Sequence, residues 1–227
     1  MGAINLLMLL AAVLTSAPSS PPVERVLAVP WRHQAHNLTC EAAALNMALE
    51  YYGIRTDEMS LIGYMTRDPR PAQFDGHGKL VTWGDPANGF VGNPDGRIER
   101  YTGYGVYYQP VAMAAMLAGA DVLQANSGLY GQRVEATDVY SAVLEGHPVV
   151  AWISNTYHQV PLEHYVAYDG STVGYTLTEH AVTVIGVKLD AVLINDPWFG
   201  QAWHAKAQFE SAYLTFDDMA AVVGPPA

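Results

Sequence analysis

Cysteine is almost absent from this chain: Cys40 is the only one among 227 residues. A single cysteine excludes an internal disulfide, so the fold must be stabilised by its hydrophobic core, and a 50% content of apolar residues is enough to build one. If the protein is exported, an unpaired thiol of this kind is potentially reactive. The first question is therefore whether Cys40 is a small core residue or a nucleophile.

Basic side chains are also scarce. The chain has 11 lysines and arginines against 22 acidic residues, which gives a formal net charge of -11, and it contains no run of basic residues. Nucleic-acid binding depends on clustered lysine and arginine side chains that contact phosphates. The composition therefore argues against a nucleic-acid partner.

Long hydrophobic runs are missing as well. The longest apolar stretch covers residues 4–14, interrupted only by Asn5, whereas a membrane-spanning helix needs about 20 residues. We therefore expect no integral membrane segment. A stretch of this length is typical of a signal-peptide core, and Thr15 and Ala17 resemble a small-x-small cleavage pattern. Residues 1–22 are predicted to be a signal peptide of a secreted or cell-surface protein; the alternatives are a disordered leader and a misassigned start codon.

Residues 23–227 are predicted to form one α+β domain, with a helical N-terminal part followed by a C-terminal antiparallel sheet. No repeat, low-complexity tract or linker divides this region. Gly, Pro, Asn and Asp crowd residues 66–109, which are predicted to form a long ordered loop. Periodicity, β-branched runs and terminating glycines or prolines predict helices over 41–52, 110–118, 137–145 and 205–212, and strands over 23–30, 148–154, 180–187, 191–197 and 219–223.

The stretch "HNLTCEAAALNMALEYYG" places Cys40 directly before a predicted helix that has little room for a polar face. Asn37 or Thr39 is predicted to cap the start of this helix, and Gly53 to end it in a left-handed conformation. The free N–H groups and the dipole of the first helical turn lower the pKa of a thiol, and the thiolate is the nucleophilic form. Because Cys40 lies at the predicted helix start, its thiol is expected to have a lowered pKa.

A nucleophilic cysteine also needs a base, a group that orients the base, and donors for the oxyanion. His180 opens one predicted strand and Asp196 ends the next, with a turn at 188–190 between them. The hairpin brings these two side chains together, so that Asp196 can hold one imidazole nitrogen while the other faces the thiol. Gln34 precedes Cys40 by six residues, from where its amide can share an oxyanion with the Cys40 N–H.

Five stretches together resemble the papain-like cysteine peptidases of family 39, best known for trimming double-glycine leaders from bacteriocin precursors: "VPWRHQAHNLTCEAAALNMALEYYG", "WGDPANGFVGNPDG", "GYGVYYQPVA", "EGHPVVAWIS" and "EHAVTVIGVKLDAVLINDPWFG". The resemblance covers residues 26–223 in the family's order and is strongest to its stand-alone members. It implies a papain-like fold, with Cys40 as nucleophile, His180 as base, Asp196 as the residue that orients His180, and Gln34 as the oxyanion glutamine.

The chain departs from the family pattern directly after the cysteine. Many members carry Gly-Pro there, whereas this chain carries Glu41 and Ala42. A carboxylate beside the thiol favours the neutral SH form and competes for the imidazolium. We therefore expect Glu41 to make the pKa of the Cys40 thiol less depressed than in such relatives.

Other histidines compete with His180 for the role of base. His164 also precedes an apolar stretch, but in an extended strand Asp169 would lie roughly 16 Å away, too far for a hydrogen bond. His33 and His36 form an H-x-x-H pair near Cys40, but no second cysteine or clear third ligand accompanies them. No metal site is therefore predicted.

Several polar residues near the loop have simpler interpretations. Asn37 begins a glycosylation sequon, but a glycan there would cover the thiol, so we interpret it as a loop residue. Turn formation is a better explanation than calcium binding for Asp85, Asn88, Asn93 and Asp95, whose spacing is not that of an EF-hand. The aromatic residues of this region, Tyr104 and Tyr107 among them, are expected to pack the loop, with substrate contact as the alternative.

The sequence thus predicts a cysteine peptidase that hydrolyses a peptide or amide bond without a cofactor. Its partner is a peptide or protein substrate. Two alternatives stay open: an acyl transferase that uses the same residues, and a non-catalytic peptide-binding module that uses residues 66–109 as its contact surface.

Overall fold

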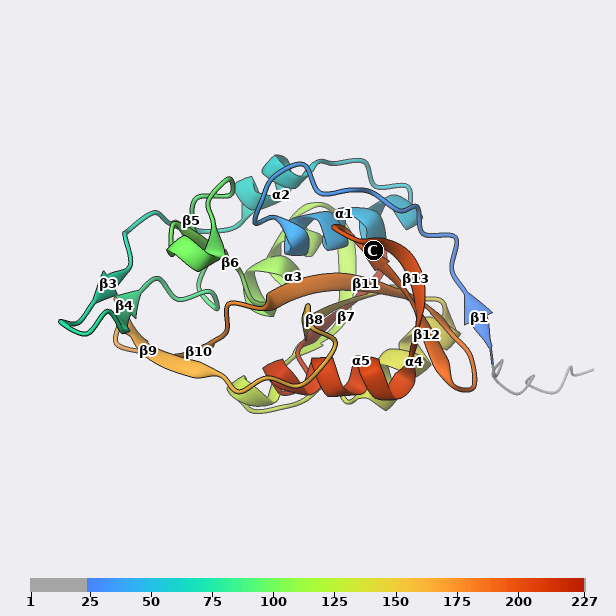
Figure 1. Ribbon diagram of the computed structural model, residues 1–227. Helices are drawn as coiled ribbons and strands as arrows, with labels where there is room; N and C mark the ends of the chain where they lie inside the picture. The colour runs from blue at the N-terminus through green and yellow to red at the C-terminus, as the bar shows by residue number, and fades with distance from the viewer. Residues whose placement is uncertain (1–23, 227) are drawn as a thin grey trace, which may run out of the picture.

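The computed structural model of the protein describes residues 24–226 (Figure 1). The predicted signal peptide, residues 1–22, lies outside the described residues. Within them, no helix is long and apolar enough to cross a membrane.

A large antiparallel sheet forms the centre of the molecule (Figure 1). Its strands follow the order β13-β12-β11-β8-β14-β7, and β1 pairs with β11 outside this path. The α+β class is confirmed, with most of the sheet built from the C-terminal half. The strand bounds are β1 Arg25–Val26, β7 Ala120–Asn126, β8 Val149–Ser154, β11 Glu179–Val187, β12 Ala191–Asp196, β13 Gly200–Ala205 and β14 Ala220–Pro226.

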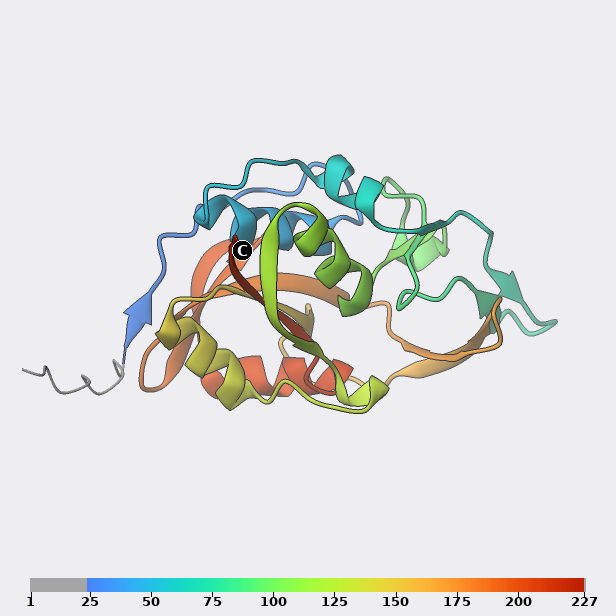
Figure 2. The ribbon, with the colours of Figure 1, turned by 180° about the vertical axis from the view of Figure 1, so that it is seen from behind.

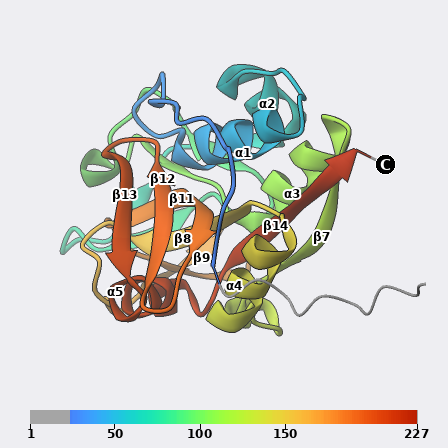
Figure 3. The same ribbon diagram turned by 90° about the vertical axis from the view of Figure 1, so that its right-hand side faces the viewer.

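Helices cover both faces of this sheet. Figure 3 shows α1, α2 and α3 on one face and α4 and α5 on the other. The four predicted helices are confirmed to within two residues at each end, and α2 is an additional one. The helix bounds are α1 Cys40–Tyr51, α2 Glu58–Tyr64, α3 Tyr108–Leu117, α4 Ala136–Glu145 and α5 Lys206–Tyr213, with single 3-10 turns at Ile98–Arg100, Gly128–Tyr130 and Leu214–Phe216.

The two-sided cover explains the continuous apolar runs of the central strands. Every residue of β8, β11 and β12 is buried. Successive side chains of a strand point to opposite faces, so on β8 Val150 and Trp152 pack in the core beneath α1 and α3, whereas Ala151 and Ile153 pack in the core beneath α4 and α5. A strand covered on both faces loses the polar alternation that marks a half-exposed one.

Helix α1 lies across the centre of the sheet and carries Cys40 at its start. Nine of its twelve residues are buried, as the absence of a polar face in the sequence predicts. Gly53 follows the helix with φ 79°, which confirms the predicted left-handed ending. The capping prediction is wrong: Thr39 occupies the N-cap position, but its hydroxyl donates to Glu58 rather than accepting from the helix.

The region predicted as one long loop, residues 66–109, is partly folded into strands. These strands extend to one side of the molecule, and Figure 2 shows the same extension from behind. A four-stranded sheet has the order β10-β9-β4-β3 and a three-stranded one the order β2-β5-β6. Their short strands sit among turn residues, so the sequence hides them. Within residues 66–109 the bounds are β2 Arg67–Asp68, β3 Gln73–Phe74, β4 Leu80–Trp83, β5 Phe90–Gly92 and β6 Gly103–Gly105. The four-stranded sheet is completed by β9 Glu163–Ala167 and β10 Thr172–Tyr175, which come from later in the chain and were not predicted either.

Two further predictions need correction. The strand expected over 23–30 is paired only at Arg25–Val26, although Leu27 and Val29 are buried in the core. Strands β7 and β13 were not predicted, because "ADVLQAN" and "GQAWHA" lack β-branched runs. Both lie at the ends of the main sheet, where a strand pairs on one side only.

Candidate active site

Cys40 is the first residue of α1, so its backbone N–H has no acceptor within the helix. Its side chain is 6% exposed and lies in the wall of a cavity of about 180 Å³. His180 and Gln34 line the same cavity. The structure therefore brings the three residues that were predicted to surround a substrate carbonyl to the wall of one open cavity.

His180 and Asp196 meet as the hairpin predicted. Strands β11 and β12 pair antiparallel, with Thr183 opposite Asn195, and this register brings the start of β11 beside the end of β12. His180 Nε2 lies 2.8 Å from Asp196 Oδ1, and both side chains are buried. This contact occupies Nε2 and leaves Nδ1 as the free imidazole nitrogen.

Asp196 is held in its charged form by several donors. Burial raises the pKa of its carboxyl, but the hydrogen bond and charge interaction with His180 and the N–H groups of Trp198 and Phe199 outweigh burial, so the pKa lies below its usual value. The two N–H groups donate to Oδ1 at 2.8 and 3.0 Å. An ionised, immobilised Asp196 fixes the orientation of the imidazole.

The Cys40 thiol has an unexpected partner. It donates to Glu41 Oε2, with Sγ and the oxygen 3.5 Å apart, and within residues 24–226 no hydrogen bond joins it to His180. Burial, followed by the charges of Glu41 and Glu179, raises the pKa of the thiol well above its usual value. The expectation that the helix start lowers this pKa is therefore wrong, because desolvation and two carboxyl groups outweigh the helix dipole.

Glu41 is fixed beneath the thiol by the backbone of another segment. Its Oε1 accepts from the Val106 N–H at 2.6 Å, and a Cβ atom at Gly105 would lie 2.1 Å from that oxygen. Glycine at 105, with φ 123°, thus makes room for the carboxyl group. Burial raises the pKa of Glu41 to about 7.

Glu179 is the residue of the site that the sequence did not predict. It is buried, lines the cavity, and its pKa is raised well above its usual value by burial and by the charge of Glu41. Strand alternation places Glu179 and His180 on opposite faces, so the sequence offered no reason to bring Glu179 near the thiol. Its one sequence signal is a carboxylate at the start of a strand that is otherwise largely apolar.

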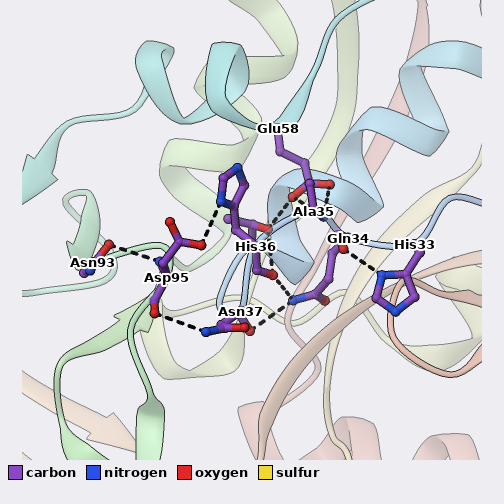
Figure 4. Close-up of polar contacts among 9 residues, drawn as sticks. His33, Gln34, Ala35, His36, Asn37, Glu58, Asn93 and Asp95 are labelled. Atoms are coloured by element: carbon purple, nitrogen blue, oxygen red, sulfur yellow. Dashed lines mark hydrogen bonds and ion pairs between the residues drawn. The ribbon is translucent and has the colours of Figure 1, made fainter.

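Gln34 lies on the loop that leads into α1, and its amide is engaged by that loop (Figure 4). Nε2 donates to the carbonyls of His36 at 2.7 Å and Asn37 at 3.1 Å. Its Oε1 is buried and accepts no hydrogen bond from residues 24–226. Gln34 is thus in the predicted place, but both of its N–H donors are directed at loop carbonyls.

The loop itself is tied to three parts of the molecule. The carboxylate of Glu58, on α2, accepts from the Ala35 N–H at 2.8 Å and from the Thr39 hydroxyl, and His36 Nδ1 lies 2.9 Å from Asp95 Oδ1 (Figure 4). The third tie is to the end of β12, where the Gln34 N–H donates to the Pro197 carbonyl at 2.9 Å. These bonds hold the loop at a defined distance from Asp196.

The other histidines considered for a base or a metal site do not form one. His164 is exposed on β9, and the Asp169 carboxylate accepts from Ser171 and Asn88. His33 Nδ1 contacts the Gln34 carbonyl while His36 contacts Asp95, so the two imidazoles do not converge on one point.

The loop residues have structural roles. Asp85 accepts from the Ala87 N–H and Asn93 from the Asp95 N–H, as expected for turns. Tyr104 and Tyr107 are 1% and 0% exposed, and a hydrogen bond joins their two hydroxyl groups. The prediction that these aromatic residues pack the loop is confirmed. Tyr104 also lines the cavity.

Comparison with known proteins identifies the family of this chain. The profile of the Peptidase_C39 like family matches residues 26–221. The chain belongs to this family. It is 28% identical over 192 residues to the uncharacterized protein YvpB of Bacillus subtilis, a match that covers 81% of this chain and 68% of that protein.

Solved structures that share the fold of this C39-like chain are described as peptidases. A crystal structure described as a C39-like peptidase from Bacillus anthracis has a TM-score of 0.71 and 27% identity, covering 90% of this chain and 98% of that one. The peptidase domain of Streptococcus ComA, a bifunctional ABC transporter, shares the fold at a TM-score of 0.51, with 12% identity and 87% and 98% coverage. Family and fold thus support a cysteine peptidase-like function, and the predicted papain-like fold is confirmed.

Glu41→Gln is expected to change how the stability of this C39-like protein depends on pH. The pKa of Glu41 rises from 4.5 to about 7 on folding. An acid with a raised pKa in the folded state contributes stability below pH 4.5 that is lost as the pH rises through about 7. Urea unfolding should therefore show that the free energy of unfolding of the variant, relative to that of the wild type, increases by roughly 2–3 kcal/mol between pH 5 and pH 8.

Glu145→Gln, at an exposed helical position, is the matched control and should show no such gain. Iodoacetamide alkylation in the presence of a chelator provides a second measurement. Removing the Glu41 charge should shift the alkylation of Cys40 to lower pH, because a neighbouring carboxylate raises the pKa of the thiol. An unfolding free-energy difference that stays constant from pH 5 to pH 8 would contradict the assignment of Glu41 as a buried carboxyl with a raised pKa.

Proposed function

We propose that this C39-like protein hydrolyses a peptide or amide bond with Cys40 as nucleophile, His180 as base, Asp196 as the orienting carboxylate and Gln34 as an oxyanion donor. The observation that carries the proposal is the His180–Asp196 hydrogen bond of 2.8 Å at the wall of the cavity that also holds Cys40. A histidine oriented by a carboxylate beside a helix-start cysteine is an arrangement suited to acyl transfer.

The first half of the reaction starts from a neutral thiol, because the pKa of Cys40 is raised in the free protein. As Sγ attacks the substrate carbonyl carbon, its proton passes to Nδ1 of His180, and the carbonyl oxygen becomes an oxyanion. The imidazolium then gives this proton to the leaving amine as the C–N bond breaks. A thioester on Cys40 remains.

The second half regenerates the thiol. Water gives a proton to Nδ1 of His180 and attacks the thioester carbonyl; the C–S bond breaks, and the proton returns to Sγ. In both halves the Cys40 N–H is available as an oxyanion donor. Gln34 joins it when one of its N–H groups turns from a loop carbonyl to the substrate oxygen.

The proposed substrate is a peptide or protein. Support comes from a double glycine motif protease of the AMS/PCAT transporter, whose crystal structure contains a leader peptide and shares this fold at a TM-score of 0.50, with 17% identity and 88% and 94% coverage. Export of the protein is part of the proposal and rests on residues 1–22 alone.

A peptide library read by mass spectrometry, with and without an added amine, tests the proposal. Hydrolysis predicts pairs of fragments in which one partner carries a new free carboxylate, whether or not the amine is present. Amide products that require the amine would indicate acyl transfer instead. Retention of intact peptides on the protein, with no cleavage, would indicate a binding module and overturn the proposal.

A further inference from the structure

Three acidic groups converge at the start of α1. Ligand atoms of Cys40, Glu41 and Glu179 all lie within 4.8 Å of one another, and all three residues are buried. Catalysis as proposed above uses only the first of them. The other two need an explanation, because carboxyl groups are rarely buried side by side without a partner.

No positive charge compensates this cluster among residues 24–226. None of the ion pairs within these residues involves Glu41 or Glu179. Glu179 is only 7% exposed, and its Oε1 is buried without a hydrogen-bond partner. An unpaired polar atom in such a position is the kind of group that a ligand satisfies.

The geometry fits a small thiophilic cation. Zinc binds thiolate sulfur at about 2.3 Å and carboxylate oxygen at about 2.0 Å, so a tetrahedral ion separates the two atoms by about 3.5 Å. Cys40 Sγ and Glu41 Oε2 are 3.5 Å apart. The Val106 N–H holds the other oxygen of Glu41, as an outer-shell partner of a metal ligand does. Calcium and magnesium prefer oxygen-only sites, so the thiol favours zinc over them.

The cluster is also reachable. Cys40 and Glu179 both line the cavity that opens beside His180, so an ion can enter by the route that the substrate takes. A water molecule from the cavity completes the fourth position of a tetrahedral site.

We propose that Cys40, Glu41 and Glu179 form a zinc site in which the metal binds the sulfur of the nucleophile. Zinc bound there takes the electron pair that attacks the substrate, so the loaded protein is inactive and removal of zinc restores it. Binding of the ion stands on geometry alone, whereas its inhibitory effect rests on the proposed peptidase function.

Titration of the full chain, stripped of metal by a chelator and dialysed, tests the site directly. Calorimetry with zinc chloride is expected to give one equivalent bound, and cobalt(II) to give the near-ultraviolet thiolate-to-metal charge-transfer absorption. Glu179→Gln should weaken zinc about tenfold or more, and Cys40→Ala should abolish the cobalt absorption. The exposed Glu145→Gln control should bind as the wild type does.

Far-UV circular dichroism and urea unfolding identify any variant that fails to fold, and Glu41→Gln then serves as the second ligand variant. Absence of zinc binding, or equal affinity in wild type and both glutamine variants, would overturn the site. Zinc binding by a protein that cleaves no peptide would leave the site intact and remove the proposed function. Peptide cleavage by a protein that neither binds zinc nor is inhibited by it would leave the proposed function intact and remove the zinc site.

Discussion

Cys40→Ala is expected to lose the cleavage of every peptide that the wild-type protein cuts, by roughly 10⁶-fold in kcat, the size of loss known for removal of a triad nucleophile. The thioester needs a sulfur at this position, and Cys40 is the only cysteine, so no other thiol can substitute. The measurement compares variant and wild type on the same library by mass spectrometry. Identical products from both would show that the cleaving group lies elsewhere.

Folding must be separated from chemistry in this comparison. The Cys40 side chain is small and 6% exposed, and alanine is favourable in a helix, so the variant should unfold at nearly the wild-type urea concentration. Cys40→Ser keeps the size and a hydrogen bond to Glu41 but replaces the polarisable sulfur. We expect it to be far less active, because a hydroxyl is a much weaker acid than a thiol and the two carboxyl groups beside it disfavour its ionisation further.

Asp196→Ala should lower kcat by roughly 10²–10⁴-fold while the protein still binds peptide. Without the carboxylate, Nε2 of His180 loses the acceptor 2.8 Å away, and the ring is free to turn its other nitrogen from the thiol. The N–H groups of Trp198 and Phe199 lose their acceptor as well, which should reduce the free energy of unfolding by about 1–3 kcal/mol.

Asp196→Asn is the matched variant, because its Oδ1 can still accept from Nε2 and from both N–H groups. It should retain most of the stability and more of the activity than the alanine variant, since orientation survives and only the charge is lost. Steady-state kinetics and urea unfolding of the two variants separate these contributions. Equal loss of kcat in both would mean that the charge of Asp196, and not its hold on the ring, is what the reaction requires.

The resting state of this site differs from a preformed thiolate–imidazolium pair. The thiol donates to Glu41, its pKa is raised, and Glu179 adds a third acid to the same buried space. Proton transfer to His180 must then accompany attack. The two carboxyl groups that keep the thiol neutral also fit a zinc ion together with its sulfur, so one arrangement accounts for both the raised pKa of the thiol and the proposed inhibition.

The sequence alone was sufficient for the parts of the fold that depend on local order. The apolar stretch that ends at Gly53 predicted α1, and β-branched runs around the turn at 188–190 predicted the hairpin. Because a short turn sets the register of its two strands, the meeting of His180 with Asp196 followed as well. The strands of residues 66–109 escaped prediction because they are two to four residues long and surrounded by turn residues.

The state of Cys40 was decided by tertiary structure. The helix start favoured a lowered pKa, but the packed core removes water from the sulfur, Gly105 and Val106 fix Glu41 beneath it, and the strand that carries His180 also delivers Glu179. The hydrogen bonds of Gln34 were likewise set by the loop that Glu58 anchors. A pKa depends on every charge and on the burial around a group. For Cys40 the adjacent Glu41 is visible in the sequence, but the burial and the charge of Glu179 come from residues far away in the chain, which only folding brings together.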